Sequence, residues 1–115
     1  MTGRSIAETA RVTAAWTASY TPALRVARGE RLSAGGTDPD NPGWRWCVNA
    51  EGLGGWLPEG LVVEGRASMA FDSVELTVRA GDLVTLLETH AGWWLCRHAD
   101  GCVGWVPDAN LARTG

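Results

Sequence analysis

The residues best suited to covalent or metal chemistry are three cysteines and two histidines. Cys96 and His98 are two residues apart, so their side chains point to the same face of an expected strand. Cys102 follows across a predicted hairpin, and His90 precedes the same strand. Such a group could hold a zinc ion, or form a thiol nucleophile with its base.

Several observations argue against this chemistry. The cysteines form no C-x-x-C pair, and the sequence offers no evident fourth ligand or orienting carboxylate. A related half of the chain, described below, has Asn49 and Leu53 at the positions of His98 and Cys102. A buried cysteine also behaves as a small hydrophobic residue. We therefore predict a protein that is not an enzyme, with no catalytic residue, no metal and no cofactor.

Tryptophan is the unusual residue of this chain, with seven copies beside one Tyr and one Phe. Each indole is a large apolar surface that must be buried or used for binding. Rigid aromatic side chains are also favoured anchors at binding sites. The tryptophans therefore predict either a binding surface or an extensive packed interface.

Composition narrows the class of partner. The 115 residues include ten Arg, no Lys and thirteen Asp and Glu, for a net charge of −3, with no basic run. This balance disfavours nucleic acid as a partner. No apolar stretch reaches the roughly 18 residues of a membrane span, so no membrane association is expected. The absence of a secretion signal and the odd number of cysteines favour a cytoplasmic protein.

The sequence contains two copies of one pattern. Residues 43–58 align without gaps to 92–107, at an offset of 49, with eight identical positions of sixteen. Upstream, the offset becomes 52 (24–30 on 76–82) and then 55 (11–16 on 66–71). The first copy therefore carries two three-residue insertions, near 17–23 and 33–42, where loops are expected.

Each copy has the pattern of short β-strands separated by turns. Residues 83–87 and 93–96 are rich in β-forming residues. Asp100-Gly101 separates two such runs and predicts a tight hairpin, and Glu51-Gly52 holds the same place in the first copy. This spacing of short strands favours a small barrel or sandwich.

The second copy resembles the SH3 family. Residues 69–72 are similar to its A-L-Y-D opening, 75–82 to E-L-S-F-x-x-G-D, 92–97 to G-W-W-x-A-R, and 104–107 to its closing G-x-(I/V)-P. The resemblance implies an all-β protein of two tandem SH3-like five-stranded β-barrels, of a bacterial, variant type. A divergent first barrel would span 11–63, with longer RT and n-Src loops, after an N-terminal extension 1–10. The second barrel would span 66–112.

SH3 domains generally bind proline-rich peptides in the polyproline II form on an aromatic groove. Carried over, the resemblance implies a peptide-binding groove in each copy: Trp16, Trp44, Trp56, Pro58 and Leu61 in the first, and Phe71, Trp93, Trp105, Pro107 and Asn110 in the second. The pattern departs from the family at Ala18 and Ser73, where a second aromatic is usual. The RT loop of the second copy, between Asp72 and Glu75, is also too short to carry the usual acidic cluster.

These observations predict a protein-interaction or adaptor module that binds an extended peptide, with or without proline, or a protein segment. In the alternative interpretation, the aromatic faces pack together or across a homodimer, and the chain binds a folded partner or acts in assembly. Recognition of bacterial cell-wall peptide is a third interpretation, which the absence of a secretion signal disfavours.

Overall fold

The structure is a computed structural model that describes residues 8–114, so most of the predicted extension 1–10 lies outside the described residues. As expected, the described chain is all-β, with one short 3-10 turn and no α-helix. Within residues 8–114 there is no helix long and apolar enough to cross a membrane.

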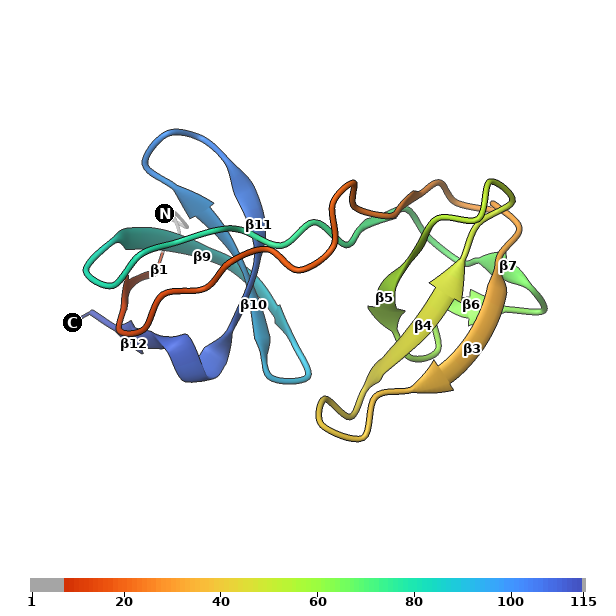
Figure 1. The fold of residues 1–115 in the computed structure, drawn as a ribbon, viewed down its shortest axis with the longest axis horizontal. Helices are drawn as coiled ribbons and strands as arrows, with labels where there is room; N and C mark the ends of the chain where they lie inside the picture. Colours follow the sequence, from red (N-terminus) through yellow and green to blue (C-terminus); the bar gives the residue numbers. More distant parts are fainter. Residues whose placement is uncertain (1–7, 115) are drawn as a thin grey trace, which may run out of the picture. The chain divides into compact units, whose positions relative to one another are not determined.

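The chain forms two compact units that interleave along the sequence. The first, here called the N/C unit, contains the N-terminal segment up to Thr17 and the chain from Leu76 onward. The second, the central unit, is the continuous segment Ala18–Glu75. In Figure 1 the chain therefore starts in the N/C unit, passes through the central unit, and returns.

One antiparallel sheet of five strands forms the N/C unit, in the order β11-β10-β9-β1-β12. Its strands are β1 (Glu8–Val12), β9 (Leu83–His90), β10 (Trp93–His98), β11 (Val103–Pro107) and β12 (Leu111–Arg113), with the 3-10 turn η1 (Asp108–Asn110) between the last two. The strand β1 therefore lies between β9 and β12, which come from the far end of the sequence. The buried core consists of Ala10, Val12, Leu76, Val78, Val84, Leu86, Cys96 and Val106.

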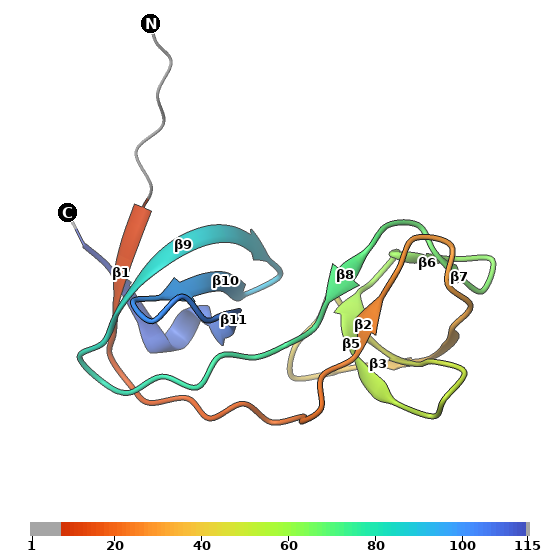
Figure 2. The same cartoon turned by 90° about the horizontal axis from the view of Figure 1, so that it is seen from above.

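The central unit contains three small sheets. A three-stranded sheet has the order β3-β4-β5, and two pairs, β2-β8 and β6-β7, accompany it; Figure 2 shows β2 beside β8. The strands are β2 (Arg25–Val26), β3 (Ser33–Thr37), β4 (Trp44–Val48), β5 (Gly54–Pro58), β6 (Val62–Val63), β7 (Arg66–Ala67) and β8 (Phe71–Asp72). The buried core consists of Leu24, Val26, Leu32, Cys47, Leu57, Leu61 and Ala67.

Both predicted hairpins are present. Strands β4 and β5 flank the Glu51-Gly52 turn, and β10 and β11 flank Asp100-Gly101. Gly52 and Gly101 have φ of 87° and 94°, in the left-handed region that favours glycine.

The opening segments of the two sequence copies occupy equivalent places, but each in the unit built from the other copy. In the N/C unit, the N–H of Val12 donates to the carbonyl of Asp82 at 2.8 Å. In the central unit, the N–H of Ala67 donates to the carbonyl of Glu30, also at 2.8 Å. The sequence offsets of 55 and 52 relate these residues pairwise. The two copies have therefore exchanged their opening segments within one chain.

The strand registers show the same correspondence. Val12 of β1 pairs with Leu111 of β12, whereas Ala67 of β7 pairs with Val62 of β6. Leu111 and Val62 are related by the offset of 49. Each opening strand thus pairs with the closing strand of the other copy. Strand β1 of the first copy pairs with β12 of the second, and β7 of the second copy pairs with β6 of the first.

The units therefore differ from the predicted contiguous domains 11–63 and 66–112. The connection 72–76, Asp-Ser-Val-Glu-Leu, has no Gly, Asn or Pro for a tight reversal of the chain. Instead it runs on: Asp72 pairs with Arg25, and the N–H and hydroxyl of Ser73 both donate to the carbonyl of Leu24, at 3.0 and 2.8 Å. The start of this connection therefore belongs to the central unit.

Candidate functional site

In the N/C unit, two tryptophans from opposite ends of the sequence lie together. The rings of Trp16 and Trp93 are 5.4 Å apart between centroids and inclined by 83°, an edge-to-face arrangement. Trp16 is fixed by two backbone hydrogen bonds with Val78, at 3.0 and 2.8 Å. Trp93 begins β10 and pairs with Pro107 at the end of β11.

Asn110 fixes the backbone that precedes Trp16. It ends the 3-10 turn after Pro107, and its amide Nδ2 donates to the carbonyls of Ala14 and Ala15, each at 3.1 Å. We refer to Trp16, Trp93, Pro107 and Asn110 as the Trp16–Trp93 site. All four are partly exposed, so their side chains remain within reach of a ligand.

The corresponding residues of the central unit are less accessible. Phe71 and Trp44 lie 6.3 Å apart between ring centroids, inclined by 59°, and Trp44 pairs with Pro58 across β4 and β5. Trp44 is only 5% exposed and Leu61 only 6%. We refer to these four residues as the Phe71–Trp44 site.

The structure regroups the two predicted grooves. Trp16 lies with Trp93, whereas the sequence pattern grouped it with Trp44. Phe71 lies with Trp44, whereas the pattern grouped it with Trp93. The reason is the exchange of the opening segments, which carry these two aromatic residues. The other members of each set stay within their own unit.

Trp105 and Trp56, also predicted to line the grooves, lie in different surroundings. Trp105 is 3% exposed, on β11 opposite Leu95. Trp56 packs edge-on against Trp46, with centroids 5.2 Å apart, and Trp46 in turn contacts Tyr20 at 5.4 Å. Trp105 is thus buried, whereas Trp56 belongs to a partly exposed cluster of three aromatic rings.

Sequence reasoning missed the other two members of this cluster, Trp46 and Tyr20. Strand alternation would have placed Trp46 on the face of Trp44, two residues away, and opposite Trp56. Gly54 makes room for it, since a Cβ at Gly54 would lie 2.3 Å from Cζ2 of Trp46. Tyr20 comes from the first residues of the central unit, before β2, and no sequence pattern indicates its contact.

The buried cysteines have environments that disfavour thiolate chemistry. Cys47 and Cys96 are 1% and 0% exposed, one in the core of each unit. Burial raises the pKa of the Cys47 thiol, and it raises the pKa of Cys96 to about 11. Both thiols are therefore protonated at neutral pH, which leaves them poor nucleophiles and poor metal ligands.

His98 lies between two carboxylates that the sequence did not reveal. Its Nε2 is 3.1 Å from Oδ2 of Asp82, and its Nδ1 is 3.4 Å from Oδ1 of Asp100. The pKa of Asp82 lies below its usual range mainly because the backbone N–H of Arg79 donates a hydrogen bond to its carboxylate. The backbone N–H of Cys102 lowers the pKa of Asp100 in the same way. Among residues 8–114, no three His, Cys, Asp or Glu side chains form a group suited to a metal ion.

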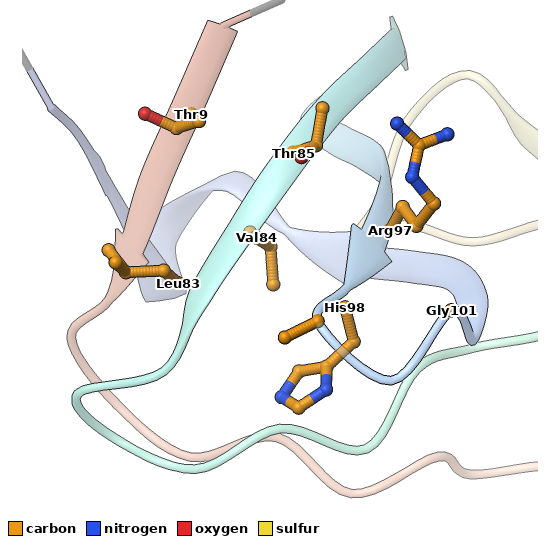
Figure 3. A pocket seen from close by; sticks show the side chains of 8 residues that line it. Thr9, Leu83, Val84, Thr85, Arg97, His98 and Gly101 are labelled. Atoms are coloured by element: carbon orange, nitrogen blue, oxygen red, sulfur yellow. The ribbon is translucent and has the colours of Figure 1, made fainter.

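A pocket of about 420 Å³ lies elsewhere on the N/C unit (Figure 3). It is lined by Thr9 of β1, by Leu83, Val84 and Thr85 of β9, and by Arg97, His98, Ala99 and Gly101. Figure 3 shows the side chains of Arg97 and His98 on opposite sides of β10. None of the ten residues predicted to bind peptide lines this pocket.

One family model matches a part of this chain. No curated protein matches the sequence. A family model described as "Variant SH3 domain" matches residues 68–112, which include Trp93, Pro107 and Asn110. Domains of this type generally mediate protein interactions. A variant SH3 domain is therefore found at residues 68–112, with 68–75 in the central unit and 76–112 in the N/C unit.

Proposed function

We propose that this chain is a non-enzymatic interaction module that binds an extended, proline-containing peptide at the Trp16–Trp93 site. The observation that supports this most strongly is the edge-to-face pair of Trp16 and Trp93, both partly exposed, next to Pro107. Three of the four residues of the site lie in the variant SH3 segment. The fourth residue, Trp16, lies outside this segment, and its ring packs against that of Trp93.

The geometry suits a ligand that is already extended. A polyproline II helix loses little conformational entropy on binding, and its ridges can contact inclined aromatic rings. Trp16 and Trp93 are inclined by 83°, so their rings present surfaces in two directions. Asn110 holds the backbone before Trp16 in place, which reduces the entropy that the site loses when a ligand binds.

The N/C unit, which contains this site, carries no net charge. The N/C unit has five Asp and Glu against five Arg, whereas the central unit has eight against five. The whole net charge of −3 therefore belongs to the central unit. We propose that the ligand residues at the Trp16–Trp93 site are uncharged.

The test is a titration of the ¹⁵N-labelled full chain with an acetylated decaproline peptide, with the tryptophan indole signals followed by NMR. We expect saturable changes at Trp16 and Trp93. The variant W93A should lose these changes, whereas W46F, in the cluster with Tyr20, should keep them. A glycine-serine peptide of equal length controls for nonspecific effects. Indole signals of Trp16 and Trp93 that stay unchanged at millimolar decaproline would contradict the proposal.

The Phe71–Trp44 site supports a different role for the central unit. Because Trp44 and Leu61 are buried, we propose that they stabilise the unit and make no contact with a ligand. The same titration tests this role, since the Trp44 indole signal should not respond to decaproline.

A further inference from the structure

The segment 8–17 is joined to the N/C unit by its contacts alone. Its only covalent link into the described chain is the peptide bond between Thr17 and Ala18, where the central unit begins. The central unit is continuous from Ala18 to Glu75 and contains none of this segment. The segment can therefore leave the N/C unit without removing a strand from the central unit.

The place that this segment occupies is specific and internal to the sheet. Strand β1 pairs with β9 on one side and with β12 on the other. Ala10 and Val12 of this strand are 0% and 1% exposed, so they contribute to the core. An N/C unit without the segment would have two unpaired strand edges and an open core, and it would bind any chain with this segment.

A second copy of the protein carries the same segment and can make every one of these contacts. The chain already shows that such a place can be filled by a segment from elsewhere in sequence. Val12 fills it in the N/C unit, and Ala67 makes the equivalent hydrogen bond in the central unit. The connection between the units is direct, because one ends at Thr17 and the next begins at Ala18.

We propose that two copies of the chain form a dimer by exchanging the segment 8–17, which in each copy lies between β9 and β12 of the other. Trp16 of one copy then lies beside Trp93 of the other, so each Trp16–Trp93 site contains residues of both chains. The proposal holds whether or not this site binds a peptide, because it rests on the strand pairing alone.

Concentration decides between the monomer and the dimer. Within one chain, the segment competes at an effective concentration on the order of millimolar. Chains unfolded and refolded together at about 1 mM should therefore form the dimer in substantial yield, whereas refolding at about 1 µM should give monomers. Once formed, the dimer should persist on dilution as long as the N/C unit stays folded.

Disulfide trapping in the full chain tests the exchange. Two differently tagged chains carry Cys102→Ser, which removes the exposed thiol. One also carries Arg11→Cys and the other Ala112→Cys, because these exposed residues are direct partners across β1 and β12. The mixture is refolded at about 1 mM and oxidised. In a control mixture, Arg28→Cys, an exposed position of the central unit, replaces Arg11→Cys.

We expect the Arg11→Cys mixture to give at least about ten times more covalent heterodimer than the control mixture, with the yield falling when refolding takes place at about 1 µM. Equal yields in the two mixtures, or no heterodimer at 1 mM, would overturn the proposal.

A single chain with both Arg11→Cys and Ala112→Cys shows that the variants fold and pair as described. At 1 µM it should form the disulfide within one chain. The matched variant with Arg66→Cys and Ala112→Cys should not, because Arg66 pairs with Val63 in the central unit. If only the matched variant forms the bond, the opening segments are not exchanged and the proposal fails.

Discussion

Shortening Val12 to alanine should destabilise the N/C unit and leave the central unit unchanged. Val12 is 1% exposed in the core of the N/C unit, although in sequence it belongs to the first copy. The substitution removes two buried methyl groups at about 0.8 kcal/mol each. With the cavity left behind, the loss should be about 2–3 kcal/mol. At a factor of ten for each 1.4 kcal/mol, this loss increases opening of the unit by about 30- to 150-fold.

Two native cysteines report on the two units separately. Cys96 is buried in the N/C unit and Cys47 in the central unit, so each reacts with an alkylating reagent only when its own unit opens. We expect Val12→Ala to accelerate labelling of Cys96 by about 30- to 150-fold, with Cys47 unchanged. The sites are distinguished by mass spectrometry of proteolytic peptides after pulses of labelling.

The matched substitution is Ala67→Gly in the central unit, at the position equivalent to Val12. Ala67 is 2% exposed in strand β7, and glycine in a strand costs roughly 0.5–1 kcal/mol in backbone entropy in addition to the lost methyl group. Labelling of Cys47 should increase about tenfold, with Cys96 unchanged. Acceleration of Cys47 by Val12→Ala would refute the exchanged arrangement, because it would mean that each opening segment belongs to its own sequence copy.

Three further outcomes follow from single residues. Gly54→Ala should lower the free energy of unfolding, measured in urea, by about 1–3 kcal/mol, because its Cβ would lie 2.3 Å from Cζ2 of Trp46. A smaller decrease would mean that the indole moves freely. Asn110→Ala removes two hydrogen bonds, so it should lower the free energy of unfolding by about 1–2 kcal/mol and weaken the binding of decaproline. Unchanged binding would mean that Asn110 does not position the site. The hydrogen bond from the backbone N–H of Arg79 holds the pKa of Asp82 below its usual 3.8, so the folded state binds fewer protons than the unfolded state. The contribution of Asp82 to the free energy of unfolding is therefore present above about pH 4 and is lost as the pH falls through the pKa of the folded state. In Asp82→Asn, the midpoint of urea unfolding should fall less steeply with acidification than in the unmodified protein.

The sequence was sufficient for local structure. Asp100-Gly101 and Glu51-Gly52 formed the predicted hairpins because the glycine of each pair adopts the left-handed backbone conformation that the reversal requires. The all-β class followed from short runs of β-forming residues. These features depend on neighbours in the chain, which a sequence pattern describes directly.

The exchange of the opening segments could not be predicted in the same way. Alignment of the copies shows that Val12 corresponds to Ala67, and Asp82 to Glu30. It does not show whether the N–H of Val12 donates to the carbonyl of Asp82, as in the structure, or to that of Glu30 in its own copy. Both pairings satisfy the same pattern of buried and exposed residues. The choice depends on the short connection 72–76, which contains no Gly, Asn or Pro and which the sequence pattern indicates only as a shortened loop.

Strand β1 pairs with strand β12, and this has a consequence for synthesis of the protein. Val12 is synthesised 99 residues before its partner Leu111. At about 5–20 residues per second, the segment waits on the order of 5–20 s before the N/C unit can form, while the central unit can already fold. Formation of the N/C unit must then close a loop that contains a folded unit, so we expect it to be the slow step of folding. During that interval the nascent chain displays an unpaired strand with two core residues, Ala10 and Val12, that neighbouring copies on the same messenger RNA could capture.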